Sequence, residues 1–305
     1  NSKMQIRLGV TKTRTRPDFG QLNPAYNITQ FDPSTGSNNP DPADAYGSAG
    51  NPDLKPLTST NYDITWEYYP EANTSASVAV FYHDLFGFIS NYTTRTNDPV
   101  YGVLEVSRPE NAGAGKIKGI EVAGQTFFDF LPSPFDGLGI QANYTHTEQE
   151  GINNSNLANQ PGYAGGGTIG FGGGLQVNGA VFDSHRLAGI SDDSYNIVGL
   201  YEKGPIAARV AYSWRSDFLT NNLDCCIGLP MWQKGSGFLD ASIRYKVSDN
   251  VEISLDGSNL LDTTTVVQQQ VMGDSGNTPG AKAVRKDSAW IRNDRRYQIG
   301  VRFKY

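Results

Sequence analysis

The sequence predicts an all-β, antiparallel up-and-down barrel that crosses a membrane. Three observations predict this class: apolar and polar residues alternate in segment after segment, the connections fall into short and long classes, and aromatic residues lie on the apolar faces. Only 38% of the 305 residues are hydrophobic. No run of about 18 apolar residues is present, which excludes a membrane-spanning helix but suits a barrel strand.

Ten segments show the alternation, because successive side chains of a strand point to opposite faces. In one of them, Val210 and Tyr212 share a face while Arg209 and Ser213 share the other. For the expected strand 195–202, the sequence does not show which residues point to the apolar face. The ten expected strands cover 4–11, 62–68, 76–83, a segment from near Val103 to 125, 138–145, 195–202, 206–215, 239–247, 251–256 and 296–305.

The connections alternate between two lengths, so short and long ones are expected at opposite ends of the sheet, as in outer-membrane barrels. A soluble sandwich also alternates its side chains, but it does not need aromatic residues at its strand ends. The short connections are 69–74, 131–137, 203–205 and 248–250, and the long ones are about 14–58, 94–101, 150–190, 218–235 and 263–292.

The net charge of −6 argues against a nucleic-acid partner, since no concentrated basic face is present. The first ten residues have no signal-peptide pattern and alternate like a strand, so we expect the chain to start inside a longer protein. His83, His146 and His185 lie on separate segments, so no metal site is predicted.

Charged residues on the polar faces are expected to line the barrel lumen. They could pair with material inside the barrel or solvate a water-filled space. The eight residues are Arg209, Arg215, Asp240, Arg244, Glu252, Asp256, Arg296 and Arg302.

The only two cysteines, Cys225 and Cys226, are adjacent in the long connection 218–235. A vicinal disulfide there would form a stiff kink able to present Trp232 or Leu229 to a ligand. Neighbouring residues are, however, closer than ordinary disulfides prefer. Either cysteine could instead pair outside this chain.

Several stretches in order resemble the C-terminal half of a TonB-dependent outer-membrane receptor. They are TRPDFGQLNP at 15–24, GNPDLKPLTSTNYDITWEYYP at 50–70, VAVFYHDLFGFI at 78–89, IKGIEVAGQ at 117–125 and FLDASIRYKVSDNVEISLDGSNLLD at 238–262. The resemblance implies that 1–305 is the last ten strands of a 22-stranded barrel. The N-terminal plug, the first strands and the TonB-binding segment of that family match nothing in the sequence.

The last strand resembles the signal that the barrel assembly machinery reads in outer-membrane barrels, because it alternates and ends in an aromatic residue. The alternative is that it only closes the sheet, and the two roles are compatible. Its apolar residues are Tyr297, Ile299, Val301, Phe303 and Tyr305.

The resemblance implies a protein of the Gram-negative outer membrane that takes up a scarce nutrient with energy from TonB, without enzymatic chemistry or a cofactor. An oligosaccharide or other organic nutrient is favoured, and Trp232, Tyr163 and Phe171 could stack on sugar rings or pack together. Alternatives are a siderophore or haem receptor of the same family, and an autonomous ten-stranded pore or protease. Membrane lipid and a surface lipoprotein are further expected partners.

Overall fold

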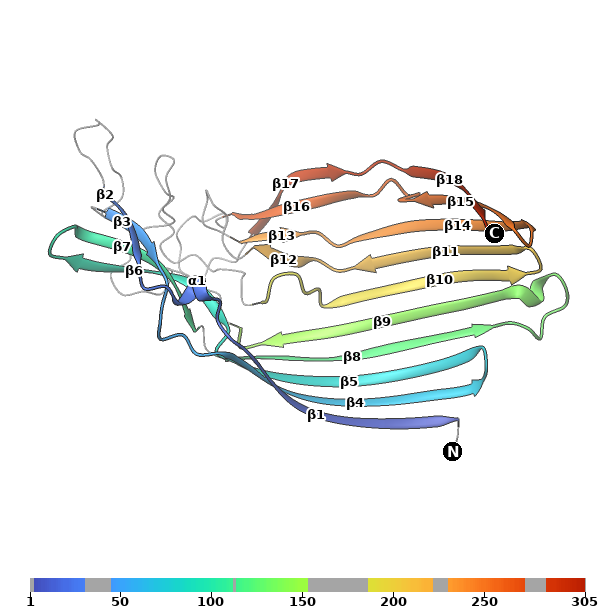
Figure 1. The fold of residues 1–305 in the computed structure, drawn as a ribbon, viewed down its shortest axis with the longest axis horizontal. Helices are drawn as coiled ribbons and strands as arrows, with labels where there is room; N and C mark the ends of the chain where they lie inside the picture. The colour runs from blue at the N-terminus through green and yellow to red at the C-terminus, as the bar shows by residue number, and fades with distance from the viewer. Residues whose placement is uncertain are drawn as a thin grey trace.

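The computed structural model describes residues 3–30, 45–111, 114–152, 186–221, 230–271 and 284–304. Ten long strands form one antiparallel sheet, in the order β1-β4-β5-β8-β9-β10-β11-β14-β15-β18 (Figure 1). Its strands are β1 (Met4–Thr15), β4 (Leu57–Glu71), β5 (Thr74–Phe86), β8 (Ala114–Phe127), β9 (Leu138–Glu150), β10 (Asp193–Lys203), β11 (Ile206–Arg215), β14 (Ser236–Ser248), β15 (Val251–Ser258) and β18 (Arg296–Phe303).

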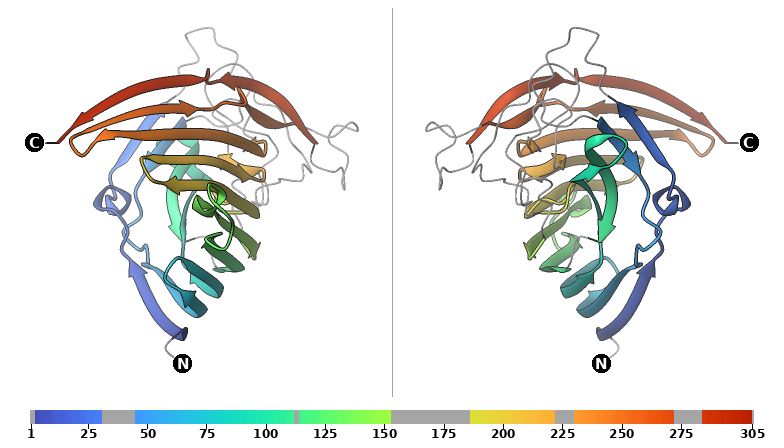
Figure 2. Two further views of the ribbon diagram at one scale, coloured as in Figure 1. Left: turned by 90° about the vertical axis from the view of Figure 1, so that its right-hand side faces the viewer. Right: turned by 90° about the vertical axis from the view of Figure 1, so that its left-hand side faces the viewer.

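The sheet is a curved, partial barrel with two free edges. Within the described residues, β1 pairs only with β4 and β18 pairs only with β15. Figure 2 shows the curvature, with the two edge strands well apart. The predicted fold class and its ten strands are therefore confirmed as a partial barrel.

Short turns and long connections lie at opposite ends of this sheet, as predicted. The turns that join β4 to β5, β8 to β9, β10 to β11 and β14 to β15 gather at the right-hand end of Figure 1. We call this the turn end. The opposite end is the loop end, where the long connections run.

In the described part of the chain, the long connections contain eight further strands. The sequence did not predict them as separate strands. They form two four-stranded sheets, β12-β13-β16-β17 and β2-β3-β7-β6. Their bounds are β2 (Tyr26–Gln30), β3 (Ala45–Ala49), β6 (Ile89–Asp98), β7 (Gly102–Asn111), β12 (Phe218–Asn221), β13 (Met231–Gln233), β16 (Thr264–Val271) and β17 (Val284–Arg292), and the short helical segments are α1 (Phe19–Leu22) and η2 (Phe135–Gly137).

The expected strand start near Val103 is wrong. The stretch 102–111 is β7, which pairs with β6 and, in parallel, with β3, and the barrel strand β8 starts only at Ala114. The reason is packing, because Leu104 and Val106 are buried against Ala45 in a small core of the sheet β2-β3-β7-β6.

The two faces of the ten-stranded sheet differ in the way that the alternation predicts. One face is apolar and exposed, with Val80, Val210 and Ile299 at 50%, 49% and 75% exposure. Ile197 lies on this face, whereas Val198 on the other face is 4% exposed, which settles the orientation of β10. An exposed apolar band of this extent needs an apolar covering.

Aromatic rings cluster on the apolar face toward the loop end. Tyr195 stacks on Trp214 with ring centroids 5.2 Å apart, and Tyr62 lies 6.2 Å from Tyr82. Gly237 makes room for this layer, because a Cβ atom there would meet the Tyr212 hydroxyl oxygen at 2.2 Å. Such a belt suits the interface between hydrocarbon and head groups.

No helix in the described residues has the length and apolar character needed to cross a membrane.

We expect Val210→Arg to lower the free energy of unfolding by about 2 to 4 kcal/mol, because it places a charge on the apolar face near the middle of β11. Denaturant unfolding of the full-length protein in lipid vesicles measures this change. Ser213→Arg, on the opposite face of the same strand, is the control and should cost far less. Equal losses for both variants would contradict the assignment of the faces.

Candidate functional site

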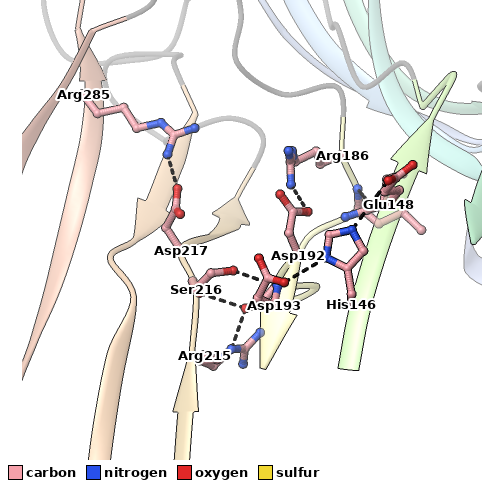
Figure 3. Close-up of polar contacts among 12 residues, drawn as sticks. His146, Glu148, Arg186, Asp192, Asp193, Arg215, Ser216, Asp217 and Arg285 are labelled. Atoms are coloured by element: carbon pink, nitrogen blue, oxygen red, sulfur yellow. Dashed lines mark hydrogen bonds and ion pairs between the residues drawn. The ribbon is translucent and has the colours of Figure 1, made fainter. Parts of the chain in front are cut away.

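The loop end of β9, β10 and β11 is held together by hydrogen bonds from the segment that leads into β10. The Thr147 backbone N–H donates to the Asp192 carbonyl (2.7 Å), and the Ser216 N–H donates to the Asp193 carbonyl (2.8 Å). The Ser191 hydroxyl donates to the Ser216 carbonyl at 2.9 Å. This segment is therefore fixed between the two neighbouring strands (Figure 3).

Arg215, one of the charged residues predicted to face the lumen, anchors that segment from β11. Its Nε donates to the Ser191 hydroxyl at 2.8 Å and its Nη2 to the Gly189 carbonyl at 2.6 Å. The guanidinium carbon also lies 3.7 Å from the centroid of the Phe218 ring. The guanidinium stays charged, because arginine is not deprotonated in proteins.

Trp232 is the packing centre of the loop-end sheet that contains β13. Its ring is 1% exposed, and the Arg285 guanidinium carbon lies 3.4 Å from the ring centroid. Arg186 approaches the same ring at 6.0 Å. Cations over an indole face are attracted by its electron-rich surface. A ligand that stacked on this ring would have to displace Arg285, so ligand stacking by Trp232 stays a prediction.

Both arginines near Trp232 are paired with carboxylates: Arg285 with Asp217, which follows β11, and Arg186 with Asp192 of its own segment, which leads into β10. Arg285 Nη1 lies 2.5 Å from Asp217 Oδ2, and Arg186 forms an ion pair with Asp192. Figure 3 shows these two pairs on neighbouring segments. The indole Nε1 of Trp232 has no hydrogen-bond partner in this part of the structure. The Arg285–Asp217 pair joins the sheet that contains β13 to the foot of β11, whereas the Arg186–Asp192 pair lies within the segment that leads into β10.

A second polar group lies on the outward, apolar face, beyond the aromatic belt. The Tyr144 hydroxyl donates to Asp193 Oδ1 at 2.6 Å, and His146 Nδ1 lies 2.8 Å from the same oxygen. Glu148 continues the chain of contacts, 3.5 Å from His146 and 3.0 Å from Lys118. His146 and Glu148 follow the belt residue Tyr144 toward the loops, so they lie outside the hydrocarbon-spanning stretch of β9.

The hydrogen bond to Asp193 raises the pKa of His146, with a smaller contribution in the same direction from Glu148 and an opposing one from desolvation. Conversely, Tyr144 and His146 lower the pKa of Asp193. The contacts therefore favour a protonated His146 that bridges β9 and the start of β10.

The eight residues predicted to line the lumen lie on β11, β14, β15 and β18, on the face opposite the apolar band. Asp240 accepts a hydrogen bond from the Asn259 backbone N–H at 2.8 Å, and Arg302 lies 3.8 Å from Glu252. The other charged residues of the set on these strands form no ion pair within the described residues; they are Arg209, Arg244, Asp256 and Arg296.

The same polar face carries a hollow of about 170 Å³ near the turn end of β4, β5, β8 and β9. Glu67, 8% exposed, lines it and lies 3.1 Å from Arg7 on β1. Tyr69 donates its hydroxyl hydrogen to Glu67 at 2.9 Å. This group was not predicted, because nothing local in the sequence fixes which residue of β1 lies beside Glu67.

Other predicted site residues lie outside the described residues: Tyr163, Phe171, Cys225, Cys226, Leu229 and the last residue, Tyr305. Four residues of the predicted assembly signal, Tyr297, Ile299, Val301 and Phe303, are on β18 and are exposed on the apolar face. Within the described ranges, no three His, Cys, Asp or Glu side chains form a group that could hold a metal ion.

An exposed apolar band, a belt of aromatic rings and a charged opposite face define the wall of a membrane β-barrel. A family model described as TonB dependent receptor-like, beta-barrel, matches residues 1–260. The chain belongs to this family.

Solved structures with the same fold include siderophore receptors. A mutant of the ferric enterobactin receptor PfeA from Pseudomonas aeruginosa, in complex with enterobactin, is 15% identical with a TM-score of 0.59; the match covers 99% of this chain and 39% of the receptor. The siderophore receptor PirA from Acinetobacter baumannii is 17% identical with a TM-score of 0.56, and the match covers 100% of this chain and 39% of that receptor. At these identities the likeness shows the fold alone. No curated protein matches the sequence.

We expect the contact between His146 and Asp193 to weaken as the pH rises. Because the pKa of His146 is raised in the folded protein, the contact contributes its full stability below the unfolded value of about 6.5 and loses it as the pH passes the folded pKa. Hydrogen exchange at the backbone N–H groups of 193–195, corrected for intrinsic rates, should show lower protection at pH 8.5 than at pH 5.5.

His146→Gln should abolish this pH dependence, and His83→Gln on β5 should leave it intact. A protection factor that does not change with pH in the unmodified protein would contradict the assigned role of His146.

Proposed function

We propose that this chain forms part of the barrel wall of an outer-membrane receptor that takes up a scarce nutrient with energy relayed through TonB. The observation that carries the proposal is the match of residues 1–260 to the barrel of this family, on a sheet with an apolar outer face and charged inner face. The reaction is binding and gated transport, and no bond in the nutrient is broken.

The free edges of β1 and β18 support closure by further strands, and so do not favour an autonomous ten-stranded pore or protease. An unpaired backbone edge in hydrocarbon costs several kcal/mol for each orphaned group. The chain spans 39% of the length of the solved receptors named above. In our proposal, additional strands and a plug complete the barrel, and a segment ahead of the plug binds TonB.

In this proposal the nutrient is an oligosaccharide or other organic nutrient, or alternatively a ferric siderophore or haem. Siderophore receptors among the structural neighbours make a siderophore at least as well supported as an oligosaccharide, although they share only the fold. The aromatic loop residues Trp232, Tyr163 and Phe171 are our candidates for ligand contacts, and a kink at Cys225 and Cys226 would help to present them.

The remaining site proposals concern the two faces of the sheet. The charged residues of the polar face, among them Arg209, Arg244 and Asp256, would contact the plug or solvate the lumen. The alternating apolar residues of β18 would be read by the barrel assembly machinery. A surface lipoprotein that captures the nutrient would act at the loop end.

Deletion of the gene should lower uptake of one nutrient class at least tenfold, measured with a labelled ferric siderophore and a labelled oligosaccharide in whole cells. The same loss is expected in cells that lack TonB, because transport through a plugged barrel needs that energy source. Restoring the gene should restore uptake. Uptake that depends on the gene but persists without TonB would contradict the proposal and indicate a passive pore.

A further inference from the structure

The hollow on the polar face near the turn end is formed by short side chains set between longer ones. The pairing register places Glu67, Ser77, Ala123 and Asn143 in one row across β4, β5, β8 and β9. Ser77 and Ala123 are short and lie in the middle of that row, so the wall is recessed between the two longer end residues. The recess of about 170 Å³ has room for several water molecules, each of which occupies about 30 Å³ in the liquid.

Two carboxamides line the hollow on its turn-end side. Gln125 of β8 and Gln141 of β9 are direct partners in the register, one row beyond Ala123 and Asn143. Ser75 of β5 pairs with Gln125 in the same row. The side chains of Gln125, Gln141 and Ser75 form no hydrogen bond with another described residue. Their polar groups are therefore available to a molecule in the lumen.

The lining of the hollow is polar but carries almost no net charge. Glu67 is the one charged residue among the described residues that line it, and its carboxylate lies 3.1 Å from the guanidinium of Arg7. The same carboxylate accepts the hydroxyl hydrogen of Tyr69 at 2.9 Å. An anionic ferric chelate would find no unpaired cation in this lining, whereas a neutral solute needs none.

We propose that this hollow binds a sugar ring of a neutral oligosaccharide as the nutrient leaves the barrel. A sugar hydroxyl both donates and accepts hydrogen bonds, and a carboxamide offers both kinds of partner. Gln125 and Gln141 supply two such groups side by side. The amide oxygen of Asn143 accepts a hydrogen bond from Asn196 at 3.2 Å, which orients the NH₂ group of Asn143 as a further donor. The inference rests on the proposed function and goes beyond it, because it selects an oligosaccharide over a ferric siderophore.

The position of the hollow suits release of the nutrient rather than its capture. The hollow lies near the turn end, and the short turns of outer-membrane barrels face the periplasm. A sugar that moves between the wall and a plug loses water from its hydroxyls, and polar groups left without a partner are costly. Carboxamides in the wall replace those water contacts and so lower the barrier to release.

The test is uptake by whole cells of two kinds of labelled nutrient: neutral oligosaccharides prepared from starch, cellulose, xylan and chitin, and ferric enterobactin. Uptake that depends on the gene should be of an oligosaccharide. For Gln125→Leu combined with Gln141→Leu, we expect about tenfold slower uptake of that oligosaccharide, because its hydroxyls lose their partners in the wall. Binding of the oligosaccharide to the surface of chilled cells should be unchanged, because the loops are untouched.

Gln298→Leu is the matched control, because it removes a carboxamide from the same polar face on β18, away from the hollow, and it should leave uptake unchanged. Gln141→Asn keeps the amide and should retain most of the uptake. If the leucine pair fails to reach the outer membrane, the milder pair Gln125→Ala and Gln141→Ala should slow uptake in the same way.

Gene-dependent uptake of ferric enterobactin alone would overturn this inference and leave the proposed function standing. Unchanged oligosaccharide uptake by a folded hollow variant would also overturn it. Entry of vancomycin into cells that express the variant would do the same, because it would mean that the hollow holds the plug. Gene-dependent uptake of neither kind of nutrient would contradict the proposed function itself, together with the inference that rests on it.

Discussion

The pairing of every strand backbone with its neighbours is the constraint on which the rest of the structure depends. In hydrocarbon, an unpaired N–H or C=O group has no water to bind, so a spanning sheet must satisfy its backbone internally. Once ten strands pair, their side chains alternate between two faces, and the polar residues of one strand align with those of the next. Glu252 beside Arg302 and Val210 beside Ala241 are two results of the same register.

This register also determines how the loop end is built. The strands present their last residues at defined positions, and the feet of the loops are fixed to them through Arg215, Ser191 and His146. The sheet β12-β13-β16-β17 then packs around Trp232, whose ring is flanked by Arg285. Arg285 in turn pairs with Asp217 at the foot of β11. A rigid wall thereby supports the surface on which a nutrient would first bind.

Sequence reasoning predicted the parts of the fold that depend on local periodicity. The ten barrel strands, the two classes of connection and the facing of residues such as Arg209 and Val210 follow from alternation alone. Strands of the loop-end sheets were missed because they depend on distant partners: β3 pairs in parallel with β7, more than fifty residues away. The same limit explains the error near Val103, where a β-forming stretch packs on Ala45 instead of joining the barrel.

The candidate site was predictable only in its general location. Trp232 was predicted as a ligand contact because it lies in the long connection 218–235. The burial of its ring under Arg285 depends on strand pairings that no local motif encodes. Glu67 and Arg7 were missed for the same reason, since their contact needs the register between β1 and β4.

The most direct test of the lipid-facing wall is spin-label accessibility along residues 206–215 of the full-length protein in lipid vesicles, with Cys225 and Cys226 replaced by serine. A lipid-facing apolar face predicts a period of two. Labels at even positions such as 208, 210 and 212 contact oxygen dissolved in lipid, and labels at odd positions contact a water-soluble relaxation agent or a plug. Uniform accessibility, or lipid contact at the odd positions, would contradict a lipid-facing apolar wall.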